Sequence, residues 1–209
     1  MKMIDQTLLP WKFRIVTLRD ARAVASAIKT MKVRGAPAIG VTAALGLAVT
    51  AARSRARDTQ GLLKELEKAA VGLRASRPTA RNLFWAVERI LGVAGNPSGR
   101  GRGQVPFIRS PSTGSGSRVS KSASREAPVP SPGFAQSLGG IRKAVIGEAK
   151  AMAREDARAC RAMARHGAKL LGKNSVVITH CNTGPLAATE VGTALGVIIR
   201  AHRQGKVRL

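Results

Sequence analysis

Apolar residues recur at helical spacing through the first 92 residues, apart from one alternating stretch near the N-terminus. Residues 11–16 alternate between apolar and basic side chains as far as Ile15, which predicts a β-strand, and residues 3–6 are its expected hairpin partner. A first helix should follow residues 17–20, which resemble a capping box with Asp20 in place of Glu. Further helices are expected to begin at Pro37, at Thr59 and after the turn at residues 76–79. The pattern predicts a small α/β domain over residues 1–92.

The composition changes abruptly after Gly92. Residues 93–140 are rich in Gly, Ser, Pro and Arg, contain Glu126 as their only acid, and show no apolar period. Residues 99–103, Gly-Arg-Gly-Arg-Gly, resemble an RNA-binding tract. Such a segment buries too little apolar surface to offset its ordering entropy, so we predict that it is disordered. It could be a flexible linker, an RNA-binding insertion or the product of a reading-frame error.

A helical period returns near Ile141 and continues to about Leu171. Residues 175–179, Ser-Val-Val-Ile-Thr, then predict a short strand of the kind buried in parallel sheets, followed by a loop and a helix through residues 193–199. The predicted fold class is therefore α/β, with residues 141–209 forming an incomplete parallel-sheet domain. A single strand with unpaired edges should make this part poorly stable and prone to aggregate.

Composition narrows the class of protein. The 209 residues suffice for one large or two small domains, and hydrophobic residues reach 44% while aromatics are only 3%. No apolar run looks long enough to cross a bilayer, the N-terminus lacks a signal-peptide pattern, and two cysteines give no disulfide framework. We expect a reduced cytoplasmic protein without a membrane partner.

The net charge of +25 raises the question of nucleic-acid binding. The basic residues are scattered along the chain, and few aromatic residues are available to stack on bases. A nucleic-acid partner is therefore not expected.

The sequence Arg34-Gly35-Ala36-Pro37 combines an arginine with the start of a helix. Unpaired N–H groups at a helix start attract anions, glycine lets a ligand approach the backbone, and a guanidinium can hold two phosphate oxygens. Arg77 could project from the rigid turn before Pro78. Taken singly, each arginine is better explained as a surface residue. An arginine, free N–H groups at a helix start and a suitably placed cysteine together suit a small phosphorylated substrate.

Cys181 follows the predicted strand at residues 175–179, where open α/β sheets bind their ligands. A nearby cation or helix start would lower its pKa and make it a candidate nucleophile or acid–base group. The alternative is a small buried apolar residue, which is also our interpretation of Cys160. No Cys/His spacing indicates a metal site, and no P-loop or dinucleotide-binding motif is present.

Several phrases together resemble one family. They lie at residues 31–40, 76–80, 82–89, 165–168, 179–184 and 192–198. Phrases like these occur in the same order in the methylthioribose-1-phosphate isomerases, whose superfamily includes the regulatory subunits of translation initiation factor 2B. The resemblance covers roughly residues 1–92 and 141–206, and an ordered set of this kind is highly specific.

The resemblance implies an aldose–ketose isomerase of methionine salvage, which converts 5-methylthioribose 1-phosphate to 5-methylthioribulose 1-phosphate. It implies that Arg34, Gly35, Ala36 and Arg77 bind the substrate, chiefly its phosphate, and that Cys181 is the catalytic thiol. It also implies a Rossmann-like second domain, a homodimer at full length, and no metal or organic cofactor.

The chain also departs from the family pattern. The family's catalytic aspartate would lie beyond Leu209, and Glu190 stands where a small residue is usual. We therefore expect this chain to be an inactive fragment. Three other functions stay open, namely a ribose-1,5-bisphosphate isomerase, a non-catalytic subunit related to initiation factor 2B, and an RNA-binding protein acting through residues 93–140. Residues 82–86 favour the methylthio substrate, and Cys181 favours an enzyme over a regulatory subunit.

Overall fold

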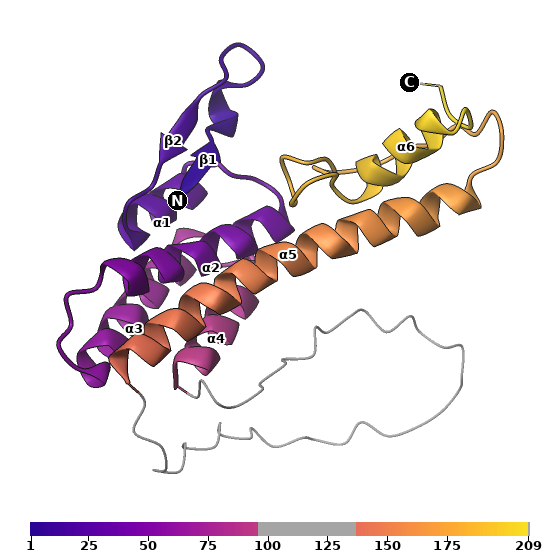
Figure 1. The fold of residues 1–209 in the computed structure, drawn as a ribbon. Coiled ribbons are helices and arrows are strands. Elements are labelled where there is room, and N and C mark those ends of the chain that lie inside the picture. Colours follow the sequence, from indigo (N-terminus) through magenta and orange to yellow (C-terminus); the bar gives the residue numbers. More distant parts are fainter. Residues whose placement is uncertain (96–136, 209) are drawn as a thin grey trace, which may run out of the picture.

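A short antiparallel hairpin precedes a bundle of helices in the computed structural model, which describes residues 1–95 and 137–208 (Figure 1). Strand β1 (Lys2–Ile4) pairs with β2 (Ile15–Thr17), and the 3-10 helix η1 (Gln6–Leu8) follows β1. The hairpin predicted from the sequence is confirmed, but its second strand starts later than residue 11. Trp11 is 93% exposed, so its place in the alternating pattern does not reflect a buried face.

Four helices form the bundle beside the hairpin. They are α1 (Ala21–Lys29), α2 (Ala36–Arg53), α3 (Thr59–Ser76) and α4 (Arg81–Gly95). The carboxylate of Asp20 caps α1 by accepting the N–H of Ala23 at 2.8 Å, and Asp58 caps α3 by accepting the N–H of Gly61 at 2.6 Å. The expected caps at residues 17 and 59 are therefore wrong, because an aspartate adjacent to each helix fills the role.

Helix α2 lies at the centre of the bundle and packs against α1, α3, α4 and the long helix α5 (Leu138–Leu170). Its buried residues are mostly small, which lets the neighbouring backbones approach closely. Its 18 residues have a mean hydropathy of 1.4, so by length and composition it is the one candidate membrane span in the described part of the chain. The expectation that no apolar run is long enough to cross a bilayer is therefore wrong. The packing of α2 among four other helices accounts for its apolar composition.

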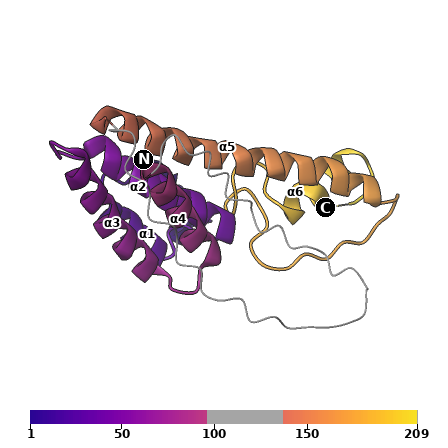
Figure 2. The same cartoon turned by 90° about the horizontal axis from the view of Figure 1, so that it is seen from below.

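Helix α5 runs the whole length of the molecule (Figure 2). Its 33 residues span about 50 Å at about 1.5 Å each. The N-terminal half completes the bundle core through Ile141, Val145, Ala149 and Met152. The C-terminal half carries α6 (Ala194–Arg203). The domain boundary predicted at residue 140 stays a prediction, and most of the basic segment at residues 93–140 lies outside the described residues.

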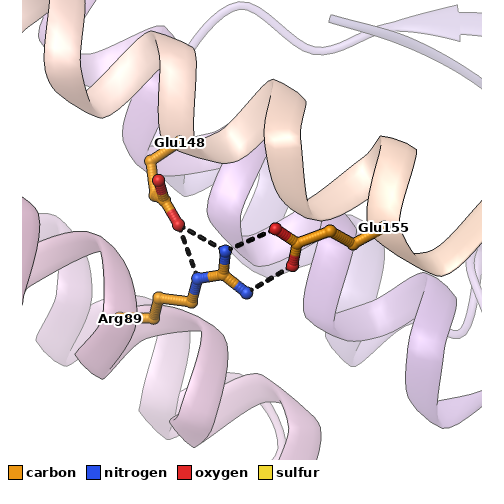
Figure 3. A network of polar contacts seen from close by, with 3 residues as sticks. All are labelled: Arg89, Glu148 and Glu155. Atoms are coloured by element: carbon orange, nitrogen blue, oxygen red, sulfur yellow. Dashed lines mark hydrogen bonds and ion pairs between the residues drawn. The ribbon is translucent and has the colours of Figure 1, made fainter. Parts of the chain in front are cut away.

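An ion-pair network fastens α5 to α4 near the middle of the long helix (Figure 3). The Arg89 guanidinium donates to Glu148 at 2.5 Å and to both carboxylate oxygens of Glu155 at 2.6 and 2.9 Å. The same guanidinium lies 5.4 Å from the ring centre of Trp85. The Arg89 side chain is only 11% exposed. Because its planar guanidinium is bonded to glutamates on either side, it fixes the register of α4 against α5.

The part of the chain after α5 has a much smaller core. Ala168, Ile198, Ala201 and Val207 form a separate buried cluster between α5, α6 and the C-terminal segment. Residues 175–180 are not a strand in this structure, contrary to the sequence-based expectation, because no neighbouring strand in the described part of the chain pairs with them. The described residues are therefore mostly helical, with one two-stranded sheet.

Candidate functional site

The first turn of α2 has an unusual start. Gly35 is the N-cap at φ +92°, and no side chain caps the helix. Pro37 supplies no N–H group, and the amide of Ala36, at the first helical position, has no partner within the helix. Ala36 is exposed. A helix start with a bare glycine and an accessible amide is suited to an anion.

The loop after Cys181 packs directly onto this helix start. The N–H of Ala38 donates to the carbonyl of Ala187 at 3.1 Å, and a side chain placed on Gly35 would lie 2.4 Å from the same carbonyl oxygen. Ala187 in turn donates to the carbonyl of Gly184, the last residue of the cysteine phrase, at 3.0 Å. Two phrases that are about 150 residues apart in the sequence are thus joined in the fold.

A second contact holds the same loop from the hairpin side. The Gln6 amide donates to the carbonyl of Leu186 at 2.7 Å. Gln6 follows Asp5, which accepts hydrogen bonds from the Thr7 hydroxyl at 2.6 Å and lies 3.4 Å from the Lys32 ammonium. These partners, chiefly the Thr7 hydroxyl, hold the pKa of the Asp5 carboxyl below its usual range. The charged carboxylate therefore keeps the turn that presents Gln6 in place.

Arg34 has an unused donor at the joined site. Its side chain is half-buried, and its Nε is buried without a hydrogen-bond partner among the described residues. Buried donors are nearly always paired in folded proteins, so an orphaned guanidinium N–H indicates a ligand or water as its partner. The structure thus places Arg34, Gly35 and Ala36 together at the start of α2.

Arg77 lies at the end of α3, where its carbonyl accepts the N–H of Ala80 at 3.0 Å in the turn before α4. The start of α4 packs on α2, because a side chain on Gly40 would lie 3.0 Å from the carbonyl oxygen of Asn82. Arg77 is half-buried, and no contact joins it to Arg34 among the described residues. Within the described part of the chain its guanidinium makes no hydrogen bond.

Cys181 is exposed and has a φ of +69°, a backbone conformation rare for residues other than glycine. The alternative of a small buried apolar residue is therefore wrong for Cys181. It is right for Cys160, which is fully buried in α5. Burial, with help from the carboxylates of Asp156 and Glu190, raises the pKa of the Cys160 thiol to about 11, which keeps it protonated and unreactive.

Helix α5 anchors the far side of the loop. Asp156 accepts hydrogen bonds from the N–H of Thr189 at 2.7 Å and from its hydroxyl at 2.6 Å. The next residue, Glu190, forms an ion pair with Arg161. Asp156, Thr189 and Gln6 could not be predicted from the sequence, because contacts over 33 and 180 residues leave no periodic signal in it.

Among the described residues, no group of three or more His, Cys, Asp or Glu side chains could hold a metal ion. The polar groups at the start of α2 are instead the Arg34 guanidinium and the backbone amide of Ala36. Their chemistry favours an anionic ligand over a cation.

The chain is similar to a known family of proteins and to several of its characterised members. The family model of the initiation factor 2 subunit family matches residues 32–208. The chain is 39% identical over 206 residues to a 5-deoxyribose 1-phosphate isomerase from Moorella thermoacetica, covering 99% of this chain and 48% of the relative. It is 41% identical over 206 residues to a methylthioribose-1-phosphate isomerase from Syntrophotalea carbinolica, covering 98% of this chain and 49% of the relative.

The crystal structure of 5-methylthioribose 1-phosphate isomerase from Pyrococcus horikoshii OT3 is similar over 99% of this chain and 48% of that one, with a TM-score of 0.75 at 33% identity. The chain therefore spans about half the length of the proteins that it matches.

Proposed function

The chain belongs to the initiation factor 2 subunit family, and we propose that it contributes one half of the active site of an aldose–ketose isomerase. The proposed reaction converts 5-methylthioribose 1-phosphate to 5-methylthioribulose 1-phosphate. The relatives named as isomerases of sugar 1-phosphates support this proposal. A homodimer, a cytoplasmic location and a Rossmann-like second domain belong to the same proposal for the whole protein.

The contact between Gly35 and Ala187 is the observation that carries the proposal. It brings the phrase that suits a phosphate into contact with the segment that follows the thiol. An isomerase acting on a sugar 1-phosphate needs both groups close together, because the reacting carbons C1 and C2 adjoin the phosphate. A regulatory subunit without chemistry would not need an exposed thiol at Cys181.

The phosphate would be held by the Arg34 guanidinium, with its unpaired Nε, and by the amide of Ala36 at the positive end of the α2 dipole. Gly35, whose φ of +92° sets the turn before α2, would bring its backbone to the phosphate, and Arg77 would add a second positive charge. The anomeric phosphate keeps the sugar ring closed, so ring opening comes first. A proton or hydride then moves between C2 and C1, and Cys181 would assist that transfer. No metal or organic cofactor is proposed.

The relatives are about twice as long as this chain. We propose that the family's catalytic aspartate belongs to the part of the relatives that this chain does not cover. The extended segment at residues 175–180, with Ile178 93% exposed, would then be the first strand of the parallel sheet of that part. Activity is therefore proposed for a protein in which both halves are present.

Ligand binding by the chain itself tests the phosphate half of the proposal. Titration calorimetry with 5-methylthioribose 1-phosphate should show one site, and methylthioribose without the phosphate should bind much more weakly. Arg34→Gln removes a charge-assisted hydrogen bond worth about 1.5–3 kcal/mol, so affinity should fall by roughly 10- to 100-fold. The matched control is Arg57→Gln, because Arg57 is exposed beyond the opposite end of α2. Equal loss in both variants would reject the site.

Turnover tests the catalytic half. The chain joined to the second half of one of the isomerases that it resembles should convert the sugar phosphate, and Cys181→Ser should abolish conversion while leaving substrate affinity within about 2-fold. A panel with 5-deoxyribose 1-phosphate and ribose 1,5-bisphosphate would decide the substrate. A folded fusion that binds substrate but shows no conversion would contradict the proposed reaction.

A further inference from the structure

A hollow lies between α5 and α6, on the side of the cysteine loop where Pro185 and Val191 form part of its lining. Its volume is about 560 Å³, within the usual range for small-molecule pockets. Four arginines line it, namely Arg161 and Arg165 from α5 and Arg200 and Arg203 from α6. We call it the basic hollow. Neither Arg34 nor Cys181 lines it.

Each helix presents its two arginines on one face, because Arg161 and Arg165 are four residues apart and Arg200 and Arg203 are three apart. The Arg161 guanidinium is paired with the Glu190 carboxylate. Among the described residues, the other three arginines make no ion pair and no side-chain hydrogen bond. The basic hollow thus collects four positive charges on exposed side chains against one negative charge, an arrangement that a bound anion would stabilise.

Helix-dipole stabilisation explains only part of this arrangement. Arg200 and Arg203 lie in the last turn of α6, where cations are favoured. Arg161 and Arg165 precede the end of α5 by more than one turn, so the dipole does not account for them. Their convergence with the α6 arginines on one hollow requires a different reason.

The residues that line the basic hollow favour a small anion over a nucleic acid. Its remaining lining includes the small or apolar residues Ala164, Pro185, Gly196 and Ile199, and no aromatic residue is present on which a base could stack. Guanidinium groups from two helices can surround a compact, multiply charged group from both sides. We propose that the basic hollow binds a compact polyphosphate, such as pyrophosphate or the phosphate end of a small phosphorylated metabolite.

This site would be coupled to the loop described above. Glu190 belongs to the loop whose Ala187 contacts Gly35, and its carboxylate competes with any anion for Arg161. A bound polyphosphate would release Glu190 from Arg161. Removal of the Glu190 charge should therefore strengthen anion binding, whereas removal of an arginine should weaken it.

Pyrophosphate is the probe. Titration calorimetry of the chain at about 0.15 M salt, where long-range charge effects are screened beyond about 8 Å, should detect a saturable site. The double variant Arg165→Gln/Arg200→Gln should weaken binding at least 10-fold, and Glu190→Gln should strengthen it about 3-fold. Arg57→Gln should leave the affinity for pyrophosphate unchanged. Arg34→Gln should also leave pyrophosphate binding unchanged, while it weakens binding of the sugar phosphate at the candidate site. Circular dichroism confirms that each variant is folded.

Several results would overturn the inference. Absence of saturable binding at this salt concentration would do so, as would equal weakening by Arg57→Gln, which would indicate general attraction to a basic chain. Pyrophosphate binding lost in Arg34→Gln but kept in the double variant would assign the anion to the candidate site instead. Binding of single-stranded RNA that depends on these arginines, without pyrophosphate binding, would make the hollow part of a nucleic-acid surface.

Discussion

Two separate requirements meet at Gly35. Its φ of +92° is costly for any residue with a side chain, and a Cβ would lie within 2.5 Å of three atoms of Ala187. The first requirement comes from the start of α2, and the second comes from the loop that α2 supports. Gly35 thus links the conformation of the Arg34-Gly35-Ala36-Pro37 phrase to the position of the cysteine loop.

Gly35→Ala should lower the free energy of unfolding by about 1–3 kcal/mol and weaken phosphate-ligand binding, because the loop must move to admit the methyl group. Chemical denaturation monitored by circular dichroism measures the first effect. Gly72→Ala is the matched control, since Gly72 is exposed in α3 with nothing within 4 Å of its added Cβ. That control should stabilise the protein by about 0.5–1 kcal/mol. Equal stability of the Gly35→Ala variant and the wild type would contradict the packing described.

Some site residues could be predicted from the sequence and others could not. The phrases around Arg34 and Cys181 stood out because glycine, proline and a thiol mark special backbone and chemistry, and the structure places the two phrases together. Whether these residues bind substrate stays a prediction. Gln6 and Asp156 are ordinary polar residues in the sequence, and their role as supports arises only from tertiary contacts.

At the scale of elements, the pairing of α4 with α5 depends on charge as well as apolar packing. Hydrogen bonds from Arg89 lower the pKa of the Glu155 carboxyl below its ordinary value of 4.5. A carboxyl whose pKa is lower in the folded state stabilises the fold above its unfolded pKa, and the stabilisation is lost as the pH falls through the folded value. The contribution of the Arg89–Glu155 ion pair to the stability of the α4–α5 contact should therefore fall at acidic pH.

Glu155→Gln tests this pH dependence. Near pH 7 the variant should be less stable than the wild type by about 1 kcal/mol or less, because the Glu155 side chain is 42% exposed and solvent screens the pair. The difference should shrink steadily as the pH falls below about 4.5 and vanish once the carboxyl is protonated. Urea unfolding at several pH values measures it. A difference that stays constant down to acidic pH would show that the ion pair contributes nothing.

Helical elements were largely predictable, because their apolar period is local. The helix expected from Pro37 to about residue 52 is α2, and the long helix expected from Ile141 to Leu171 is α5. The strand expected at residues 175–179 does not form in the structure, because a strand forms only with a partner. An apolar run such as Val176-Val177-Ile178 records a preference for burial, not the presence of a neighbour.

At the scale of the whole molecule, the two buried clusters differ greatly in size. The larger one joins the hairpin, the bundle and the first half of α5, whereas the smaller one consists of Ala168, Ile198, Ala201 and Val207. Val176 and Ile178 are 94% and 93% exposed beside the smaller cluster. Regions with few buried contacts open at lower free energy than the global unfolding reaction.

Hydrogen exchange followed by mass spectrometry should therefore show two levels of protection. Amides of α6 should exchange at least about 10-fold faster than those of α2, because local opening of the smaller cluster costs less free energy. Val176→Lys/Ile178→Lys should reduce self-association, measured by light scattering, without changing exchange in α2. Uniform protection across α2 and α6 would show a single cooperative unit instead.

The long helix α5 also has a mechanical consequence. From Glu155 to Leu170 it extends about 22 Å beyond its fastening to α4, so a bend of about 5° at that point would displace its end by about 2 Å. The cysteine loop is hydrogen-bonded to α5 at Asp156, one residue after Glu155, so the same bend would displace that contact very little. The basic hollow is farther along the arm and would move more. Flexing of α5 would thus move Arg165 relative to the loop residues Pro185 and Val191, which line the same basic hollow, and so change the width of that hollow.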